Sequence, residues 1–143
     1  MITVHPYLNF NGNTEEAFEF YKSVFGGEFM QIYRFENVPW LEHLSEKEKN
    51  GIMHMALPIG KDTILMGTDT LECMDQNTTF GTNVSLSIDT DTLEEAERLF
   101  AGLSEWGTVL SPLKMEFRNA YRGQIKDKFG VLRMINFDPT PKK

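Results

Sequence analysis

Two stretches of the chain alternate apolar and polar residues. Alternation with a period of two is typical of a strand that has one apolar and one polar face. We expect the apolar face of each strand to be covered by the helix that follows it. The apolar positions are Ile2, Val4, Leu8 and Phe10 in residues 2–10, and Val84, Leu86 and Ile88 in residues 83–89.

The residues after the first of these strands predict a helix over residues 14–25. Asn13 is the expected N-cap, with Glu16 three residues further on as in a capping box. Gly26 and Gly27 follow the helix and supply the left-handed conformation that ends many helices. One apolar stripe at helical spacing marks the buried side of this helix. It consists of Ala17, Phe20, Tyr21 and Val24.

A second copy of this pattern lies 79 residues further along the chain. Thr92 takes the place of Asn13 as the expected cap, and the stripe stays apolar. The outer positions differ, because Phe18 and Phe25 give way to polar residues in the second copy, so we expect both to face solvent. Packing constrains a buried face more than an exposed one, which indicates a duplicated unit. The second stripe consists of Ala96, Leu99, Phe100 and Leu103.

Three further strands are predicted after each helix, so each half of the chain is β-α-β-β-β. The sequence therefore predicts an α+β fold of two tandem βαβββ modules, whose curved mixed sheets surround a trough and carry the helices on their outer faces. The further strands are residues 28–35, 52–59, 63–68, 108–113, 120–126 and 131–137. The expected bounds are 1–68 for the first module, 69–81 for a linker, 82–138 for the second module and 139–143 for a tail.

Charge and composition narrow the possible partners. The 143 residues carry a net charge of −7 at pH 7, and the terminal Lys142 and Lys143 are the longest basic run, so nucleic acid and membranes are not expected partners. Cys73 is the single cysteine, which leaves no internal disulfide and no cysteine-rich metal site. No apolar run has the length of a membrane span or the place of a secretion signal, so we expect a cytoplasmic protein.

The motifs on these elements resemble a known group of proteins. The segments are PYLNFNGNTEEAFEFYKSVFGGE, IMHMALPIG, NVSLSID and DKFGVLRMIN. Together they are similar to the glyoxalase/bleomycin-resistance (vicinal oxygen chelate) superfamily, and within it to the PhnB-like family, often described as 3-demethylubiquinone 3-methyltransferase-like. The resemblance covers nearly the whole chain and implies a homodimer that binds a small molecule in the trough. Two open sheets with exposed edges are a physical reason to expect the same dimer.

The resemblance also implies four positions where the metal enzymes of the superfamily hold an ion. They fall at or next to His5, near Met66, on Asn83 and on Met134. Thioether and amide groups are poor ligands for divalent ions of this kind, so we expect no cofactor. A divalent metal held by His5 and His54 is the alternative. No glycine-rich loop joins a strand to a helix, so we do not expect cofactor-dependent methyl transfer.

Candidate ligand-binding residues lie on the polar strand faces around the expected trough. Arg122 suits a carboxylate or phosphate, and the methionines give an adaptable apolar lining. Trp40 and Leu41, in the polar segment 36–51, are candidates for a lid or a dimer contact. No pattern identifies a catalytic residue. The full set of candidates is His5, Tyr7, His54, Met66, Asn83, Ser85, Arg122 and Met134.

The sequence thus favours a metal-free protein that binds a small organic ligand in the trough, with its reaction unknown. One alternative is a divalent-metal-dependent lyase, isomerase or dioxygenase of the same superfamily. The other is a non-catalytic regulatory or scaffolding dimer. Whether the protein is an enzyme stays open at this stage.

Overall fold

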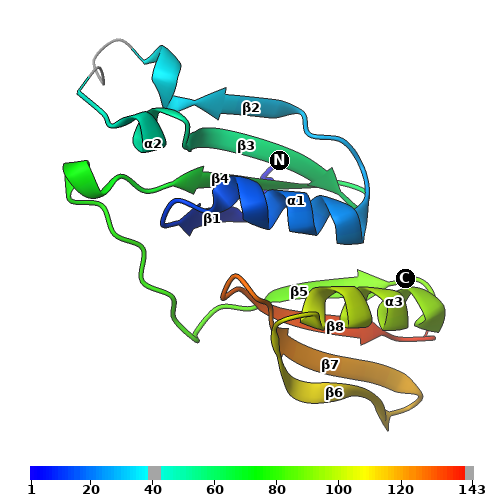
Figure 1. The fold of residues 1–143 in the computed structure, drawn as a ribbon. Coiled ribbons are helices and arrows are strands. Elements are labelled where there is room, and N and C mark those ends of the chain that lie inside the picture. The colour runs from blue at the N-terminus through cyan, green and yellow to red at the C-terminus, as the bar shows by residue number, and fades with distance from the viewer. Residues whose placement is uncertain (39–42, 141–143) are drawn as a thin grey trace. The chain divides into compact units, whose positions relative to one another are not determined.

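The computed structural model describes residues 1–38 and 43–140. The chain divides into two compact units, Met1–Thr79 and Phe80–Lys143. Figure 1 shows that each unit consists of a four-stranded sheet with a helix against one of its faces. Trp40 and Leu41, the expected lid or dimer contact, lie outside the described residues. The module and linker bounds expected from the sequence stay predictions.

The first unit has its strands in the order β1-β4-β3-β2. β1 and β4 are parallel, and the other neighbouring strands are antiparallel. The helix between the first two strands therefore makes a crossover that lies against one face of the sheet. The elements are β1 (Tyr7–Phe10), α1 (Thr14–Phe25), β2 (Gln31–Arg34), η1 (Phe35–Asn37), α2 (Glu46–Lys49), β3 (Ile52–Ile59), β4 (Thr63–Asp69) and η3 (Glu72–Met74).

The second unit repeats this topology with the strand order β5-β8-β7-β6. Its first and last strands are again parallel, and the others are antiparallel. The predicted α+β class, with two βαβββ units and a helix on one face of each sheet, is confirmed. A trough shared by the two sheets stays a prediction. The elements are β5 (Leu86–Thr90), α3 (Leu93–Ser104), β6 (Thr108–Phe117), β7 (Ala120–Lys126) and β8 (Leu132–Phe137).

Both first strands start later than the alternation predicts. Val4 is 86% exposed and Val84 is 66% exposed, and both precede their strand, so the prediction that they face a helix is wrong. At β1 the cause is local: the Met66 amide donates to the Pro6 carbonyl, but the Ile64 amide donates to the His5 Nδ1 atom at 3.0 Å. A side chain replaces the next backbone acceptor, and the ladder ends there.

Helix α1 has the predicted bounds, but its cap is wrong. Asn13 makes no side-chain cap hydrogen bond. The buried carboxylate of Asp69, at the end of β4, accepts instead from the Thr14 amide at 2.9 Å and from the Thr14 hydroxyl at 2.6 Å. Its other oxygen accepts from the Ile52 amide at 2.8 Å. One side chain thus joins the start of α1 to β3 and β4, and supplies a negative charge at the positive end of the helix.

The exposed position predicted for Phe18 is also wrong, because this ring is fully buried. It packs over Gly67 of β4, where an added β-carbon would lie 2.7 Å from Phe18 Cε1. The glycine therefore makes the room that the ring occupies. In the second unit Thr92 accepts from the Glu95 amide at 3.1 Å, as predicted. Ala96, Leu99 and Leu103 of the predicted stripe are buried, whereas Phe100 is half-buried.

The second unit contains a buried ion pair next to its last hairpin. Asp127 Oδ1 accepts from the amides of Phe129 at 2.9 Å and Val131 at 3.1 Å. Its other oxygen lies 3.4 Å from Arg133 Nε, and both side chains are almost fully buried. The turn that begins at Asp127 therefore holds Arg133 on the face of β8 that α3 covers. Met134 lies on the other face of the strand. None of the helices in the described ranges has the length and apolar character needed to cross a membrane.

Candidate functional site

The face of the first sheet that α1 leaves open carries most of the candidates of the first unit. Register places Tyr7 of β1 opposite Met66 of β4, Met66 opposite Ala56 of β3, and Ala56 opposite Gln31 of β2. Residues at alternate positions on a strand share a face, so His54 lies on this face with Ala56. The structure therefore brings together Tyr7, His54 and Met66 from three strands.

Three rings gather on this open face. The Tyr7 hydroxyl lies 3.4 Å from His54 Nδ1, a long hydrogen bond, and the two ring centroids are 5.8 Å apart. Tyr33 of β2 pairs with His54, with 6.4 Å between the centroids. Sequence analysis missed Tyr33. Its alternation with Gln31 in the strand predicted over residues 28–35 was the available signal, but only the register shows that its neighbour is His54.

His5 stands apart from this cluster. It precedes β1, and its Nδ1 atom accepts from the Ile64 amide, so its role in the structure is to end the ladder between β1 and β4. A ring nitrogen that accepts a backbone proton has no lone pair left for a metal. His5 thus bonds to the Ile64 amide and His54 to the Tyr7 hydroxyl. The arrangement does not favour a metal site that joins His5 to His54.

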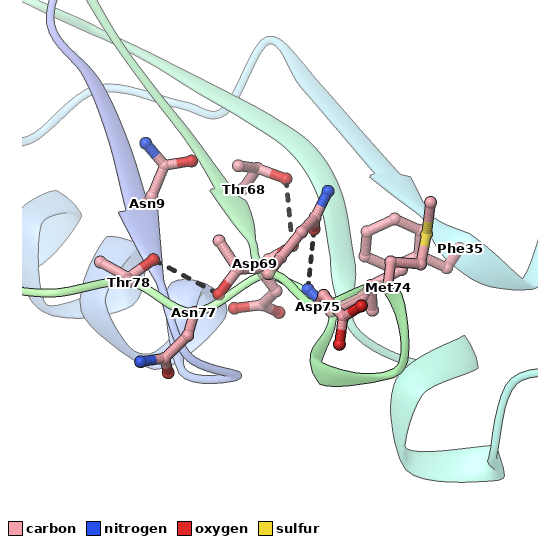
Figure 2. A pocket seen from close by; sticks show the side chains of 11 residues that line it. Asn9, Phe35, Thr68, Asp69, Met74, Asp75, Asn77 and Thr78 are labelled. Atoms are coloured by element: carbon pink, nitrogen blue, oxygen red, sulfur yellow. Dashed lines mark hydrogen bonds between the residues drawn. The ribbon is translucent and has the colours of Figure 1, made fainter.

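A cavity of about 700 Å³ lies next to the open face of the first sheet (Figure 2). Asn9 and Thr68, which pair across β1 and β4, belong to both the open face and the cavity wall. The rest of the wall comes from the end of β4, from η1 and from the segment after β4. Its apolar side chains are Phe35, Leu71 and Met74, and its other members are Asp69, Thr70, Asp75, Gln76, Asn77 and Thr78.

Hydrogen bonds hold the segment after β4 against Asn11, which follows β1. The Asn11 amide group donates to the Thr78 carbonyl at 2.9 Å and accepts from the Thr78 amide at 2.9 Å, so it pairs with the backbone as a strand residue would. Thr70 Oγ1 donates to the same Asn11 oxygen at 2.9 Å. Gln76 accepts from the Leu71 amide at 2.9 Å and closes the turn. Most residues of segment 70–78 thus line the cavity, and the expectation that this segment is also part of a linker stays a prediction.

A second cavity of about 970 Å³ shares this segment and contains Cys73. The Cys73 thiol hydrogen-bonds the Glu48 carboxylate, which raises the pKa of the thiol and lowers the pKa of Glu48. A thiol with a raised pKa is a poor nucleophile, because the thiolate is the reactive form. The hydrogen bond to Glu48 therefore does not favour Cys73 as a nucleophile.

An ion pair ties the first turn of α1 to the end of β2. Arg34 donates to the two carboxylate oxygens of Glu15, at 2.6 Å and 3.1 Å. This hydrogen bonding lowers the pKa of Glu15 and raises the pKa of Arg34. Arg34 also donates to the Asn50 carbonyl at 2.8 Å, so one guanidinium joins α1 to the chain that leads into β3.

The open face of the second sheet is more polar. One row of paired residues is Ser87, Met134, Gln124 and Ser111, and the next is Asp89, Asn136, Arg122 and Lys114. Arg122 and Met134 line a cavity of about 260 Å³ in this unit. Asn83 and Ser85 precede β5, are exposed and do not line that cavity. The candidates of the second unit are thus split between the sheet and the segment before it.

The donor atoms on the open faces do not suit a divalent metal. Met66 lies opposite Tyr7 in the first sheet and Met134 lies opposite Ser87 in the second, so the central pair of each unit offers a thioether with a phenol or a hydroxyl. Such a set matches neither the nitrogen and thiolate preference of Zn²⁺ nor the carboxylate preference of Mg²⁺. Within residues 1–38 and 43–140, no group of three or more His, Cys, Asp or Glu side chains is placed to hold a metal ion.

The fold defines a protein of the glyoxalase type. A glyoxalase/bleomycin resistance protein/dioxygenase family enzyme from Burkholderia phytofirmans PsJN has a similar solved structure, with a TM-score of 0.58 at 20% identity over 92% of this chain and 95% of that one. At this identity the likeness shows the fold alone. A family model described as 3-demethylubiquinone-9 3-methyltransferase matches residues 2–135, and the chain belongs to that family.

Two solved structures are more similar to this chain. Protein PA1353 from Pseudomonas aeruginosa is 35% identical, with a TM-score of 0.83 over 96% of this chain and 98% of that one. A structure described as a putative 3-demethylubiquinone-9 3-methyltransferase, PhnB protein, from Bacillus cereus is 26% identical, with a TM-score of 0.77 over 96% of this chain and 100% of that one. The resemblance to PhnB-like proteins of the glyoxalase/bleomycin-resistance superfamily is confirmed.

Proposed function

We propose that this protein binds a small organic ligand, without a metal, on the open face of its first sheet and in the adjoining cavity. The observation that carries the proposal is the cavity of about 700 Å³ beside Asn9 and Thr68. Its size falls in the range of small-molecule sites, and its wall combines apolar side chains with a few polar groups, as such sites do. The rings of Tyr7 and His54 and the thioether of Met66 extend this surface along the sheet.

The second unit supplies a smaller place for an anionic group. Arg122 is exposed and lines the cavity of about 260 Å³ with Met134, and a guanidinium suits carboxylate or phosphate. Asp89 and Asp138 line the same cavity, so an anionic group would have to contact Arg122 on the side away from them. His5, Asn83 and Ser85 lie outside both cavities, and we keep them as predicted trough residues that ligand mapping would have to identify. Methyl transfer, which the family description names, is not part of the proposal. The only glycine between β1 and α1 is Gly12, and the first amide of α1 is already bonded to Asp69.

The test is a thermal-shift screen of a metabolite library, run with and without EDTA. A ligand at a hundred times its Kd stabilises the folded state by about 2.7 kcal/mol, which raises the midpoint measurably. We expect a hit that is insensitive to EDTA and weakened by Asn9→Ala or Asn77→Ala. Asn13→Ala is the matched control, because Asn13 makes no side-chain cap hydrogen bond and lines neither cavity.

The results distinguish the three functions considered. Loss of stabilisation on adding EDTA, with about one divalent ion per chain in metal analysis, would overturn the proposal in favour of a metal enzyme. The absence of any stabilising compound would favour a regulatory or scaffolding role. A hit that Asn9→Ala and Asn77→Ala leave unchanged would show that the site lies elsewhere.

We also propose a homodimer in the cytoplasm. The supporting observation is that large apolar side chains on the edge strands are exposed, among them Ile32 on β2 and Val109 and Leu110 on β6. Edge strands with exposed apolar residues readily pair with another chain. Light scattering at micromolar concentration should give about twice the chain mass of 16.5 kDa, and a particle of 16.5 kDa would contradict the dimer.

A further inference from the structure

The first sheet carries three rings on the face opposite to α1. Tyr7, His54 and Tyr33 come from three different strands and form a continuous surface through their contacts with His54. The rings of Tyr7 and His54 are inclined by 33°, and those of Tyr33 and His54 by 30°, so each tyrosine ring is closer to parallel than to perpendicular with the histidine ring. We call these three residues the ring platform.

The platform does not belong to the core of the first unit. Tyr7 is 46% exposed and Tyr33 is 51% exposed, whereas three aromatic residues of β1 and α1 are fully buried, namely Phe10, Phe18 and Tyr21. A tyrosine that only fills the core would turn its ring toward the helix. These two rings turn away from α1 and leave about half of their surface accessible.

The neighbours of the platform on the open face are uncharged, while Tyr33 also lines a cavity of about 330 Å³ with Arg34 and Glu36. The open-face residues that register places beside it are Met66, Ala56 and Gln31, and Asn9 and Thr68 follow along the strands. These described neighbours include no charged side chain. The methionine sulfur adds a polarisable contact for a ring, and the polar groups lie at the side where the cavity of about 700 Å³ begins.

We infer that the ring platform selects a ligand with a planar, uncharged aromatic ring, whose polar substituent reaches Asn9 and Thr68. This inference rests on the proposed function and names the class of ligand. A flat ring has a π-face on which tyrosine and histidine rings stack favourably, and the gain exceeds that of burying the same apolar area. A saturated ring of similar size is puckered and offers hydrogens instead of a π-face, so it loses this gain.

The experiment uses two probes that share a skeleton and differ in the planarity and aromaticity of their rings. 2-Naphthol and decahydro-2-naphthol have the same carbon skeleton and one hydroxyl group, but only the first is planar and aromatic. Each is titrated into the full chain labelled with ¹⁵N and with ¹³C in the histidine ring. We expect 2-naphthol to bind saturably with shifts of the His54 ring signals, and the saturated probe to bind at least about five-fold more weakly, within the usual value of an aromatic pair.

Substitutions then locate the contact. Tyr7→Leu and Tyr33→Leu keep an apolar side chain but remove the ring, and each should weaken 2-naphthol about two- to ten-fold. Their midpoints of unfolding should stay near that of the parent, because both side chains are half exposed. Phe117→Leu is the matched control, since Phe117 is an exposed ring of the second unit that should not affect binding.

Each other outcome contradicts the inference in a distinguishable way. Equal binding of both probes, with shifts at His54, would overturn the selection of planar rings and leave small-ligand binding on this face intact. Shifts confined to the second unit, or no loss with either tyrosine variant, would overturn the platform as the site. No saturable binding of 2-naphthol would overturn the ring class, while the metabolite screen would still decide the proposed function.

Discussion

The carboxylate of Asp69 is the side chain whose loss should affect the first unit most. It accepts three hydrogen bonds, two from Thr14 and one from the Ile52 amide, and it is buried. These bonds join α1 to β3 and β4 beneath the cavity of about 700 Å³, since Asp69 also lines that cavity. We therefore choose Asp69→Asn, which keeps the shape of the side chain and removes one acceptor atom.

The magnitude follows from the geometry of the three donors. An asparagine oxygen can face Thr14, but its NH₂ group then meets the Ile52 amide, donor against donor. One hydrogen bond to a charged acceptor is lost, two become bonds to a neutral one, and a buried donor is left unsatisfied. Relief of the buried charge offsets part of this loss, so we expect Asp69→Asn to cost about 2–4 kcal/mol. Thr14→Val removes the hydroxyl bond alone and should cost about 1 kcal/mol.

The assay is thermal unfolding together with amide hydrogen exchange at single residues. The midpoint should fall by roughly 5–15 °C for Asp69→Asn. Exchange should increase first at the amides of Thr14 and Ile52, while the amides of α3 stay protected. Glu19→Gln, which changes an exposed carboxylate on the same helix, is the control. A midpoint for Asp69→Asn within about 1 °C of the parent would refute the view that Asp69 caps α1.

Three further predictions concern substitutions of single residues. Gly67→Ala should cost about 1–3 kcal/mol in thermal unfolding, because the added carbon meets the buried ring of Phe18, and a neutral result would contradict that packing. The hydrogen bonds from Arg34 lower the pKa of Glu15, so the ion pair stabilises the folded state by about 0.5–1 kcal/mol above the ordinary pKa of glutamate. This stabilisation is lost as the pH falls through the lowered pKa. Glu15→Gln should therefore reduce stability at pH 7 and flatten the acid side of the curve of stability against pH. Trp106 has φ 62° and is 82% exposed, so Trp106→Gly should raise stability by about 1 kcal/mol in urea unfolding, and a loss would show that the indole packs in solution.

Several features of the fold were predictable because they depend on neighbouring residues. The bounds of α1, the Thr92 cap and the apolar stripe of α3 all follow from residues within a few positions of one another. The repeated order of strand and helix then limits the topology, since the crossover between parallel strands puts the helix on one face. Periodicity and capping are short-range properties, and they can be recognised in the chain before any of it is folded.

The candidate site was predictable only in part. Tyr7, His54 and Met66 are recognisable as residues on polar or methionine-rich strand faces, and the structure places them together. Tyr33 joins them through a register that pairs it with His54, which lies 21 residues further along the chain. The cavity wall depends on Asn11, which bonds to Thr78 across 67 positions. Contacts between residues so far apart in the chain leave no periodic pattern in the sequence.

The amino-acid sequence by itself determined where the helices lie, that the unit is repeated, and that the strands have one apolar and one polar face. Only the tertiary structure decided that Asp69 and not Asn13 caps α1, that His5 ends a ladder, and that Phe18 is buried over Gly67. The physical reason is that propensity and spacing act within one or two turns of chain. Which distant backbone group or void a side chain reaches is decided by strand pairing and packing, after the segments have come together.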